Sequence, residues 1–103
     1  MYKTLFVDDE RIIREGISNL IDWERITGQE LTLAENAKVA LKYLEHEKYE
    51  IVISDIYMQD MKELNWRNVL KENGQMLSLY YCRHMKILIM PEKQLRQVFL
   101  NIC

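Results

Sequence analysis

The 103-residue chain has little proline, glycine or cysteine, with one, three and two of each. Cys82 and Cys103 lack the spacing of a metal site, so we expect free thiols in a reducing compartment. No apolar run approaches the roughly 18 residues that a membrane span needs. Residues 1–3 lead into a strand-like segment and not into a signal peptide. These absences predict a cytoplasmic protein that does not associate with membranes.

The chain also lacks an excess of one charge, because 14 basic and 16 acidic residues give a net charge of −2 at pH 7. The two signs are interspersed and form no basic patch, which argues against direct nucleic-acid binding by this chain. Hydrophobic residues make up 49% of the sequence, enough for the modest core of one small domain.

Strand-like and helix-like segments alternate over the first half of the chain. Strands are expected at residues 3–7, 30–34 and 49–54, and a helix is expected at residues 10–22. A second helix begins after Asn36 and carries Ala37, Ala40, Leu41 and Leu44 on one stripe. This alternation predicts βαβ units, and therefore an α/β fold with a parallel sheet and right-handed crossovers.

Acidic residues follow two of these strands: Asp8 and Asp9 end the first, and Asp55 ends the third. The carboxyl ends of parallel strands converge at one edge of a sheet, so we expect the three carboxylates to lie together. They would repel one another by roughly 4 kcal/mol per pair at 4 Å and an effective dielectric near 20. A bound hard cation is the interpretation we favour over three solvated loop residues.

Residues 5–16, 34–37 and 51–58 strongly resemble the receiver domain of two-component response regulators, in order and spacing as well as in sequence. Residues 20–23, Leu-Ile-Asp-Trp, resemble the receivers that precede an arabinose-regulator-type helix-turn-helix output domain. The resemblance covers residues 1–61. It implies a flavodoxin-like doubly wound parallel sheet, of which this stretch encodes three of the family's five strands.

The resemblance implies that Asp55 is the phosphoacceptor, which attacks a phosphohistidine on a sensor histidine kinase. It also implies Mg²⁺, held by Asp55, by Asp9 directly, by Asp8 partly through water, and by the backbone carbonyl of Tyr57. Such a chain is a signalling protein of transcription regulation and not an enzyme. A receiver-type homodimer is left open.

Three features of the family are missing. Gln59 stands after Met58, where proline is common, and neither the switch Ser or Thr after strand four nor the Lys after strand five can be placed. The nominal candidates, to which we assign no role, are Ser78, Lys86 and Lys93. Residues 77–82 and 87–90 have strand-like composition, and residues 62–73 and those after Pro91 have helix-like composition.

Our hypothesis for these departures is a change of reading frame near Met61, which we favour over a divergent receiver read in frame. When residues 62–103 are back-translated and read from the third base of each codon, the frame permits Gly-Ile-Glu-Leu-Ala-Gln-Arg-Leu-Lys and later Ile-Ile-Leu-Leu-Ser-Ala-Tyr. These stretches resemble the second half of a receiver, including its switch Ser. We therefore expect residues 1–61 to be the N-terminal half of a receiver and residues 62–103 a frame-shifted tail.

The expected result is a truncated and impaired receiver whose sheet has an unpaired edge, which would invite aggregation. Two alternatives remain. One is a small Mg²⁺- or Ca²⁺-binding or interaction module without phosphotransfer. The other is a phosphate hydrolase, which is weaker because no general acid is placed beside Asp55.

Overall fold

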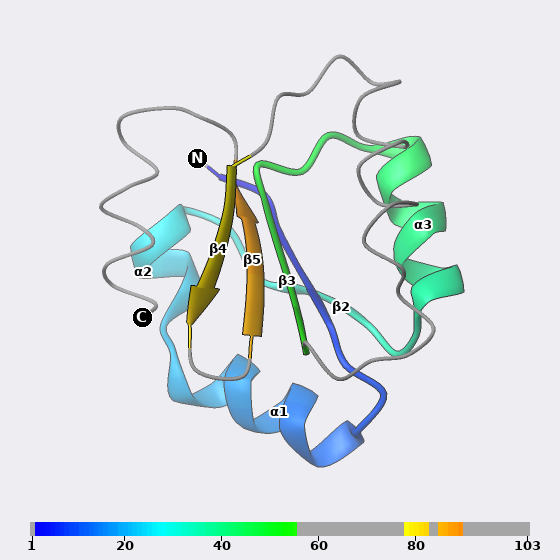
Figure 1. Cartoon of the computed structure of the whole chain (residues 1–103). Coiled ribbons are helices and arrows are strands. Elements are labelled where there is room, and N and C mark those ends of the chain that lie inside the picture. Colours follow the sequence, from blue (N-terminus) through cyan, green and yellow to red (C-terminus); the bar gives the residue numbers. More distant parts are fainter. Residues whose placement is uncertain (1, 56–77, 83–84, 90–103) are drawn as a thin grey trace.

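The computed structural model describes residues 2–55, 78–82 and 85–89, with side chains over residues 2–54 (Figure 1). Its elements, in chain order, are β1 (Thr4–Val7), α1 (Arg11–Leu20), α2 (Trp23–Thr27), β2 (Thr32–Ala34), α3 (Ala37–His46), β3 (Ile51–Asp55), β4 (Ser78–Cys82) and β5 (Met85–Ile89). The predicted alternation of strands and helices is confirmed over the first half, and α2 is an additional helix. The helices predicted at 62–73 and after Pro91 lie outside the described residues.

The five described strands form one sheet in the order β2-β1-β3-β5-β4. β1 lies between β2 and β3 and pairs with both in parallel, with Leu5 opposite Thr32 on one side and opposite Val52 on the other. The predicted α/β arrangement with a parallel sheet is therefore confirmed for these three strands.

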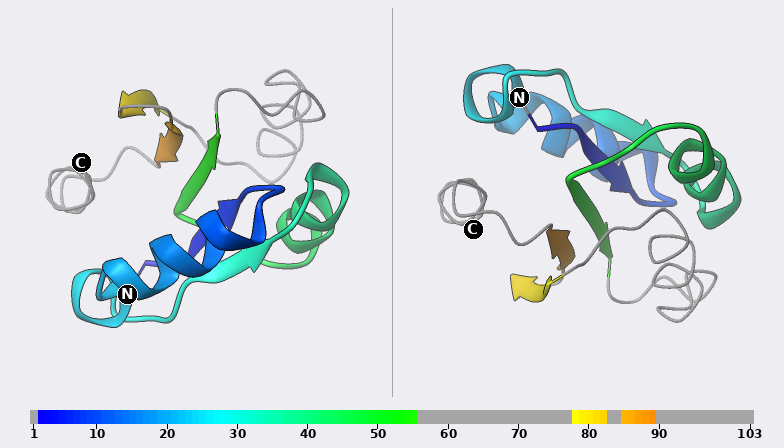
Figure 2. Two further views of the ribbon diagram at one scale, coloured as in Figure 1. Left: turned by 90° about the horizontal axis from the view of Figure 1, so that it is seen from below. Right: turned by 90° about the horizontal axis from the view of Figure 1, so that it is seen from above.

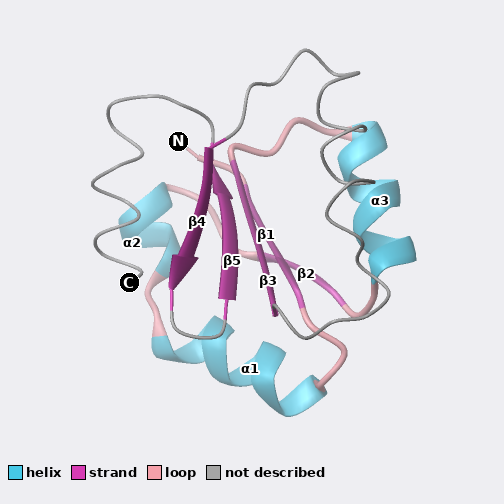
Figure 3. Ribbon diagram, in the orientation of Figure 1, coloured by secondary structure: helices cyan, strands magenta, loops and turns pink. Residues whose placement is uncertain are grey.

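The prediction that the sheet ends in an unpaired edge after its third strand, β3, is wrong. β5 pairs with β3 in antiparallel orientation, and β4 pairs with β5 in the same way, so that the two add a hairpin beside β3 (Figure 3). Residues 85–89, Met-Lys-Ile-Leu-Ile, are rich in strand-forming residues, and an exposed strand edge offers them unpaired N–H and C=O groups. The sheet departs from a fully parallel one after Asp55.

Side chains of β1 and β3 alternate between the two faces of the sheet, and each face has its own core. Leu5, Val7 and Val52 pack with Ala40 and Leu44 of α3. Phe6, Ile51 and Ile53 pack with Trp23 of α2 and with Ile17 and Ile21, which lie in and just after α1. Helices thus cover both faces, as a doubly wound sheet requires, and Figure 2 shows α1 and α3 from two further directions.

Local capping determines where the helices begin and end. Asn36 begins α3, and its side-chain oxygen accepts a hydrogen bond from the Val39 amide at 2.9 Å, as predicted. Asp22 likewise caps α2 and accepts from the Arg25 amide at 3.2 Å. The predicted helix over 10–22 is therefore too long: α1 ends at Leu20, and Asp22 begins a new helix.

Trp23 is the anchor of α2. It is buried against the sheet, and its indole N–H donates to the Ile17 carbonyl at 3.0 Å, which ties α2 to α1. Gly28 closes α2 with a positive φ of 84°, and its amide donates to the Glu24 carbonyl at 2.8 Å. Among the described residues, no helix is long and apolar enough to cross a membrane.

Candidate functional site

The acidic pair lies where β1 ends. The Asp8 amide donates to the Ala34 carbonyl at 3.1 Å, so β1 and β2 stay paired one residue beyond Val7. Asp8 is buried, with 4% of its surface exposed, whereas Asp9 is exposed. Burial of a carboxylate is costly unless hydrogen bonds compensate it, and Asp8 Oδ1 accepts from the Glu10 amide at 2.9 Å. The two acids therefore have different environments: one is held within the turn and the other faces solvent.

A third bond holds the backbone of this turn. Arg14, on α1, donates from Nη1 to the Asp8 carbonyl at 2.8 Å. Amide, carboxylate and carbonyl of Asp8 are thus bonded to Ala34, Glu10 and Arg14 respectively. Glu10 is the N-terminal capping residue of α1, as expected for a charge at a helix N-terminus, although its side chain makes no capping bond. The turn that presents the acids is therefore well fixed.

The register of β1 and β3 brings Asp55 to the same edge. Val7 is the partner of Ser54 in this parallel pair, so Asp8 and Asp55 follow side by side, one residue further along each strand. Neighbouring strands lie about 4.8 Å apart. The backbone of Asp55 is described and its side chain is not, and Tyr57 lies outside the described residues. The backbone thus places Asp8 and Asp55 at the same sheet edge, and the convergence of the three carboxylates stays a prediction.

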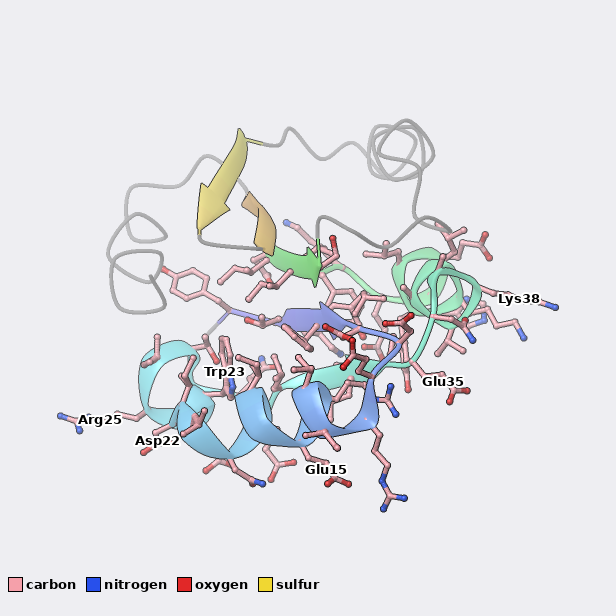
Figure 4. The ribbon with its side chains drawn as sticks, turned by 60° about the horizontal axis from the view of Figure 1, so that its bottom comes forward. Glu15, Asp22, Trp23, Arg25, Glu35 and Lys38 are labelled. Carbon is pink, nitrogen blue, oxygen red and sulfur yellow. The ribbon has the colours of Figure 1, made fainter. Side chains whose placement is uncertain are left out.

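Three other charged side chains, those of Glu15, Asp22 and Arg25, lie on the outer sides of α1 and α2. Figure 4 shows Asp22 and Arg25 pointing outward from α2, while Trp23 of the same helix points toward the sheet. Glu15 lies on the outer side of α1, where it accepts from Arg11 at 2.9 Å. Glu35, exposed in the loop from β2 to α3, is a further acid near this edge of the sheet.

The donor chemistry of the turn fits a hard cation. Carboxylate and carbonyl oxygens are the ligands that Mg²⁺ takes, and the ion usually keeps several waters. Within the described part of the chain, no group of three His, Cys, Asp or Glu residues is placed to hold a metal. Asp8 and Asp9 could hold such an ion only together with a further ligand, such as Asp55.

For the remaining residues named from the sequence, the structure describes only a backbone position, an exposed side chain or neither. Ser78 is the first residue of β4, and Lys86 of β5 is the backbone partner of Ser54, with neither side chain described. Lys93, Gln59 and His84 lie outside the described residues. His46 is exposed in the last turn of α3, as expected of a surface residue. The sequence interpretation missed Arg14, whose bond to Asp8 depends on the exact phase of α1.

The fold and the acidic edge define a class, a small α/β domain with carboxylates at the carboxyl ends of parallel strands. Comparison with protein families makes this specific, because residues 4–97 match the response regulator receiver domain. The chain therefore belongs to the receiver domains of response regulators. The match extends beyond the 61 residues in which the resemblance is evident by inspection.

Curated relatives are transcriptional regulators. The chain is 39% identical over 64 residues to the uncharacterized transcriptional regulatory protein YesN of Bacillus subtilis, an alignment that covers 62% of this chain and 17% of that protein. It is 36% identical over 75 residues to the transcriptional regulatory protein YdfI of the same organism, covering 70% and 33%. It is 38% identical over 58 residues to HptR of Staphylococcus aureus, covering 56% and 23%.

The chain therefore spans only about a sixth to a third of the length of these relatives. No solved structure matches the chain.

Proposed function

We propose that the chain is a phosphoryl acceptor, in which Asp55 takes a phosphoryl group from a sensor histidine kinase. The observation that carries this proposal is the β1–β3 register, which makes Asp55 the neighbour of Asp8 at the carboxyl edge of the sheet. Membership of the receiver family supplies the reaction class. The carboxylate forms an acyl phosphate as the phosphorus–nitrogen bond of the phosphohistidine breaks, so the chain is a substrate of the transfer rather than an enzyme.

Mg²⁺ is the cofactor in this proposal, and Asp9, Asp55 and the Tyr57 carbonyl would hold it, with Asp8 acting partly through water. The exposure of Asp9 and the burial of Asp8 support this division of roles. Asp8 Oδ1 is engaged with the Glu10 amide, so its carboxylate is better suited to orient a water than to replace one. When bound, the ion would neutralise charge between the acids and the phosphoryl oxygens.

The proposal places the chain in the cytoplasm, as a partner of a histidine kinase and without nucleic-acid binding of its own. Its relatives are transcriptional regulatory proteins about two to four times its length, so an effect on transcription would need parts beyond the matched region. A homodimer of receivers would be the remaining partner.

Labelling with radioactive acetyl phosphate and Mg²⁺ tests the proposal. We expect acid-stable, hydroxylamine-labile label on the wild-type chain and none on Asp55→Asn. Asp22→Asn is a matched control, because it makes the same change at an exposed residue and asparagine caps a helix as well as aspartate. Equal labelling of wild type and Asp55→Asn would refute the assignment.

The alternative is a small module that binds Mg²⁺ or Ca²⁺, or a protein partner, without phosphotransfer. The observation that favours it is the fixed acidic turn, in which the Glu10 amide holds the carboxylate of Asp8. Calorimetric binding of either ion, combined with no label from acetyl phosphate, would support this alternative over the first proposal.

The division of the chain at Met61 is a second part of the proposal. We assign residues 1–61 to the N-terminal half of a receiver and residues 62–103 to a frame-shifted tail that impairs it. The antiparallel hairpin beside β3 supports this, since a parallel sheet ends at the strand that precedes Met61. The nucleotide sequence decides the matter: a stop codon in the third-base frame shortly after Met61, or codons unlike those of a receiver, would contradict it.

A further inference from the structure

Arg14 contacts the one peptide group that joins the two acids of the turn. Its Nη1 donates to the carbonyl oxygen of Asp8 at 2.8 Å, and that carbonyl belongs to the peptide unit between Asp8 and Asp9. Because a peptide unit is planar, fixing the direction of its C=O also fixes the direction in which Asp9 leaves the turn. Arg14 is half-buried on α1, and this bond connects the helix to the turn.

We propose that Arg14 is the positioning residue of the Mg²⁺ site, which orients Asp9 through the Asp8 carbonyl. This inference rests on the proposed function, in which Asp8 and Asp9 serve that ion. The second bond of the turn, from the Glu10 amide to Asp8 Oδ1, fixes the other acid. Together the two bonds attach the Asp8 carboxylate and the Asp8–Asp9 peptide group to the N-terminal end of α1.

A positioning role and a purely electrostatic role predict opposite effects on metal affinity. Arg14 is a permanent positive charge beside two carboxylates. If it acted through charge alone, its neutralisation would make the site more negative and strengthen Mg²⁺ binding. If it orients Asp9, its loss weakens Mg²⁺ binding, and loss of such an outer partner typically costs 10–100-fold in metal affinity. The sign of the change therefore separates the two roles.

Titration of the full chain with MgCl₂ by isothermal calorimetry measures this sign. We expect Arg14→Met to bind Mg²⁺ about tenfold more weakly than wild type, and Arg14→Lys, which keeps a charge and a donor, to recover most of the loss. Arg11→Met is the matched control, because Arg11 lies on the same helix, is exposed and pairs with Glu15 rather than with the turn. Arg11→Met removes the same charge as Arg14→Met, and its affinity for Mg²⁺ should stay within about twofold of the wild-type value.

Amide hydrogen exchange of Glu10 gives a readout that needs no metal. The Glu10 N–H bonds to Asp8 Oδ1, so we expect it to exchange faster in Arg14→Met and at the wild-type rate in Arg11→Met. If Arg14→Met does not fold, Arg14→Gln takes its place, since its shorter amide does not reach the same carbonyl. Equal or tighter Mg²⁺ binding by the folded neutral variant would overturn the inference alone. A wild-type chain that binds no Mg²⁺ would overturn the proposed function and this inference with it.

Discussion

The Lys3 ammonium lies over the ring of Tyr49, 5.3 Å from the ring centroid. The same ammonium pairs with Glu47, and the Lys3 amide donates to Glu50 Oε2 at 2.6 Å. Tyr43 meets Tyr49 edge to face, with centroids 6.5 Å apart. This cluster joins the start of β1 to the segment between α3 and β3, so it lies at the opposite end of β1 from Asp8 and Asp9. Substitutions in this cluster can thus change the stability of the fold without altering the acids at the other end of β1.

Tyr49 makes stability sensitive to alkaline pH. Burial raises the pKa of its phenol above the ordinary value of 10.0, against a smaller opposing effect of a hydrogen bond with Thr32. Between the unfolded-state and folded-state pKa values, the phenol of Tyr49 therefore keeps its proton in the folded state and has lost it in the unfolded state. The stability that Tyr49 contributes through this difference in pKa is complete below pH 10.0, and it is lost as the pH rises through the folded-state pKa. We expect Tyr49→Phe to flatten the fall in melting temperature above pH 10.0.

The control for this alkaline effect is Tyr43→Phe. It removes a phenol from the neighbouring ring, which is 38% exposed. Melting temperatures of the three proteins, measured by circular dichroism across alkaline pH, make the comparison. A wild-type curve that falls in parallel with that of Tyr49→Phe would exclude the burial of this phenol as its cause.

Leu44 and Leu20 test the core with one chemical change. Leu44 of α3 is 1% exposed and packs with Leu5, Val7 and Val52, whereas Leu20 at the end of α1 is 82% exposed. We expect Leu44→Ala to lower the free energy of unfolding by about 2–5 kcal/mol. Leu20→Ala should change it by less than about 0.5 kcal/mol. Urea unfolding, followed through the fluorescence of the buried Trp23, measures both losses. Similar losses in the two variants would contradict this difference in burial between Leu44 and Leu20.

The periodic spacing of apolar residues predicted most of the strands and helices in the first half of the chain. The apolar runs at β1 and β3 and the stripe of α3 follow from periodicity, and Asn36 begins its helix as its side chain requires. The placement of Asp8 and Asp55 at one edge of the sheet was also predictable from the sequence, because it follows from parallel pairing alone. These features depend on neighbours in sequence or on topology, both of which the residues encode directly.

Features that depend on a single distant contact were not predicted. α2 has five residues, and it depends on the Asp22 cap, on Gly28 and on the burial of Trp23. The pairing of β5 with β3 joins residues far apart in sequence, so composition indicated the strands but neither their partner nor their direction. The bond from Arg14 to Asp8 needs the position of α1 against the turn, which periodicity does not provide.

Removing the cap of α3 should cost a definite amount of stability. The Asn36 side chain accepts from the Val39 amide, one of the donors that a helix start leaves unpaired. We expect Asn36→Ala to lower the free energy of unfolding by about 1 kcal/mol. Asn36→Asp keeps an acceptor and should stay near the wild-type value. Chemical denaturation of the three proteins provides the measurement, and an unaffected Asn36→Ala would show that water replaces the cap.

Substitutions of Asp9 and Glu35 distinguish a direct metal ligand from an acid that is only nearby. Both are exposed acids that follow neighbouring strands of the sheet, β1 and β2. If Asp9 binds Mg²⁺ directly, Asp9→Asn should weaken binding at least about tenfold. Without the ion it should slightly raise the melting temperature, because one repulsion between carboxylates is gone. Glu35→Gln removes the same charge and should do neither. Calorimetric titration with MgCl₂ and thermal melts with and without the ion measure the two effects. Equal losses of affinity in both variants would mean that the edge attracts Mg²⁺ through its charge alone, without Asp9 as a specific ligand.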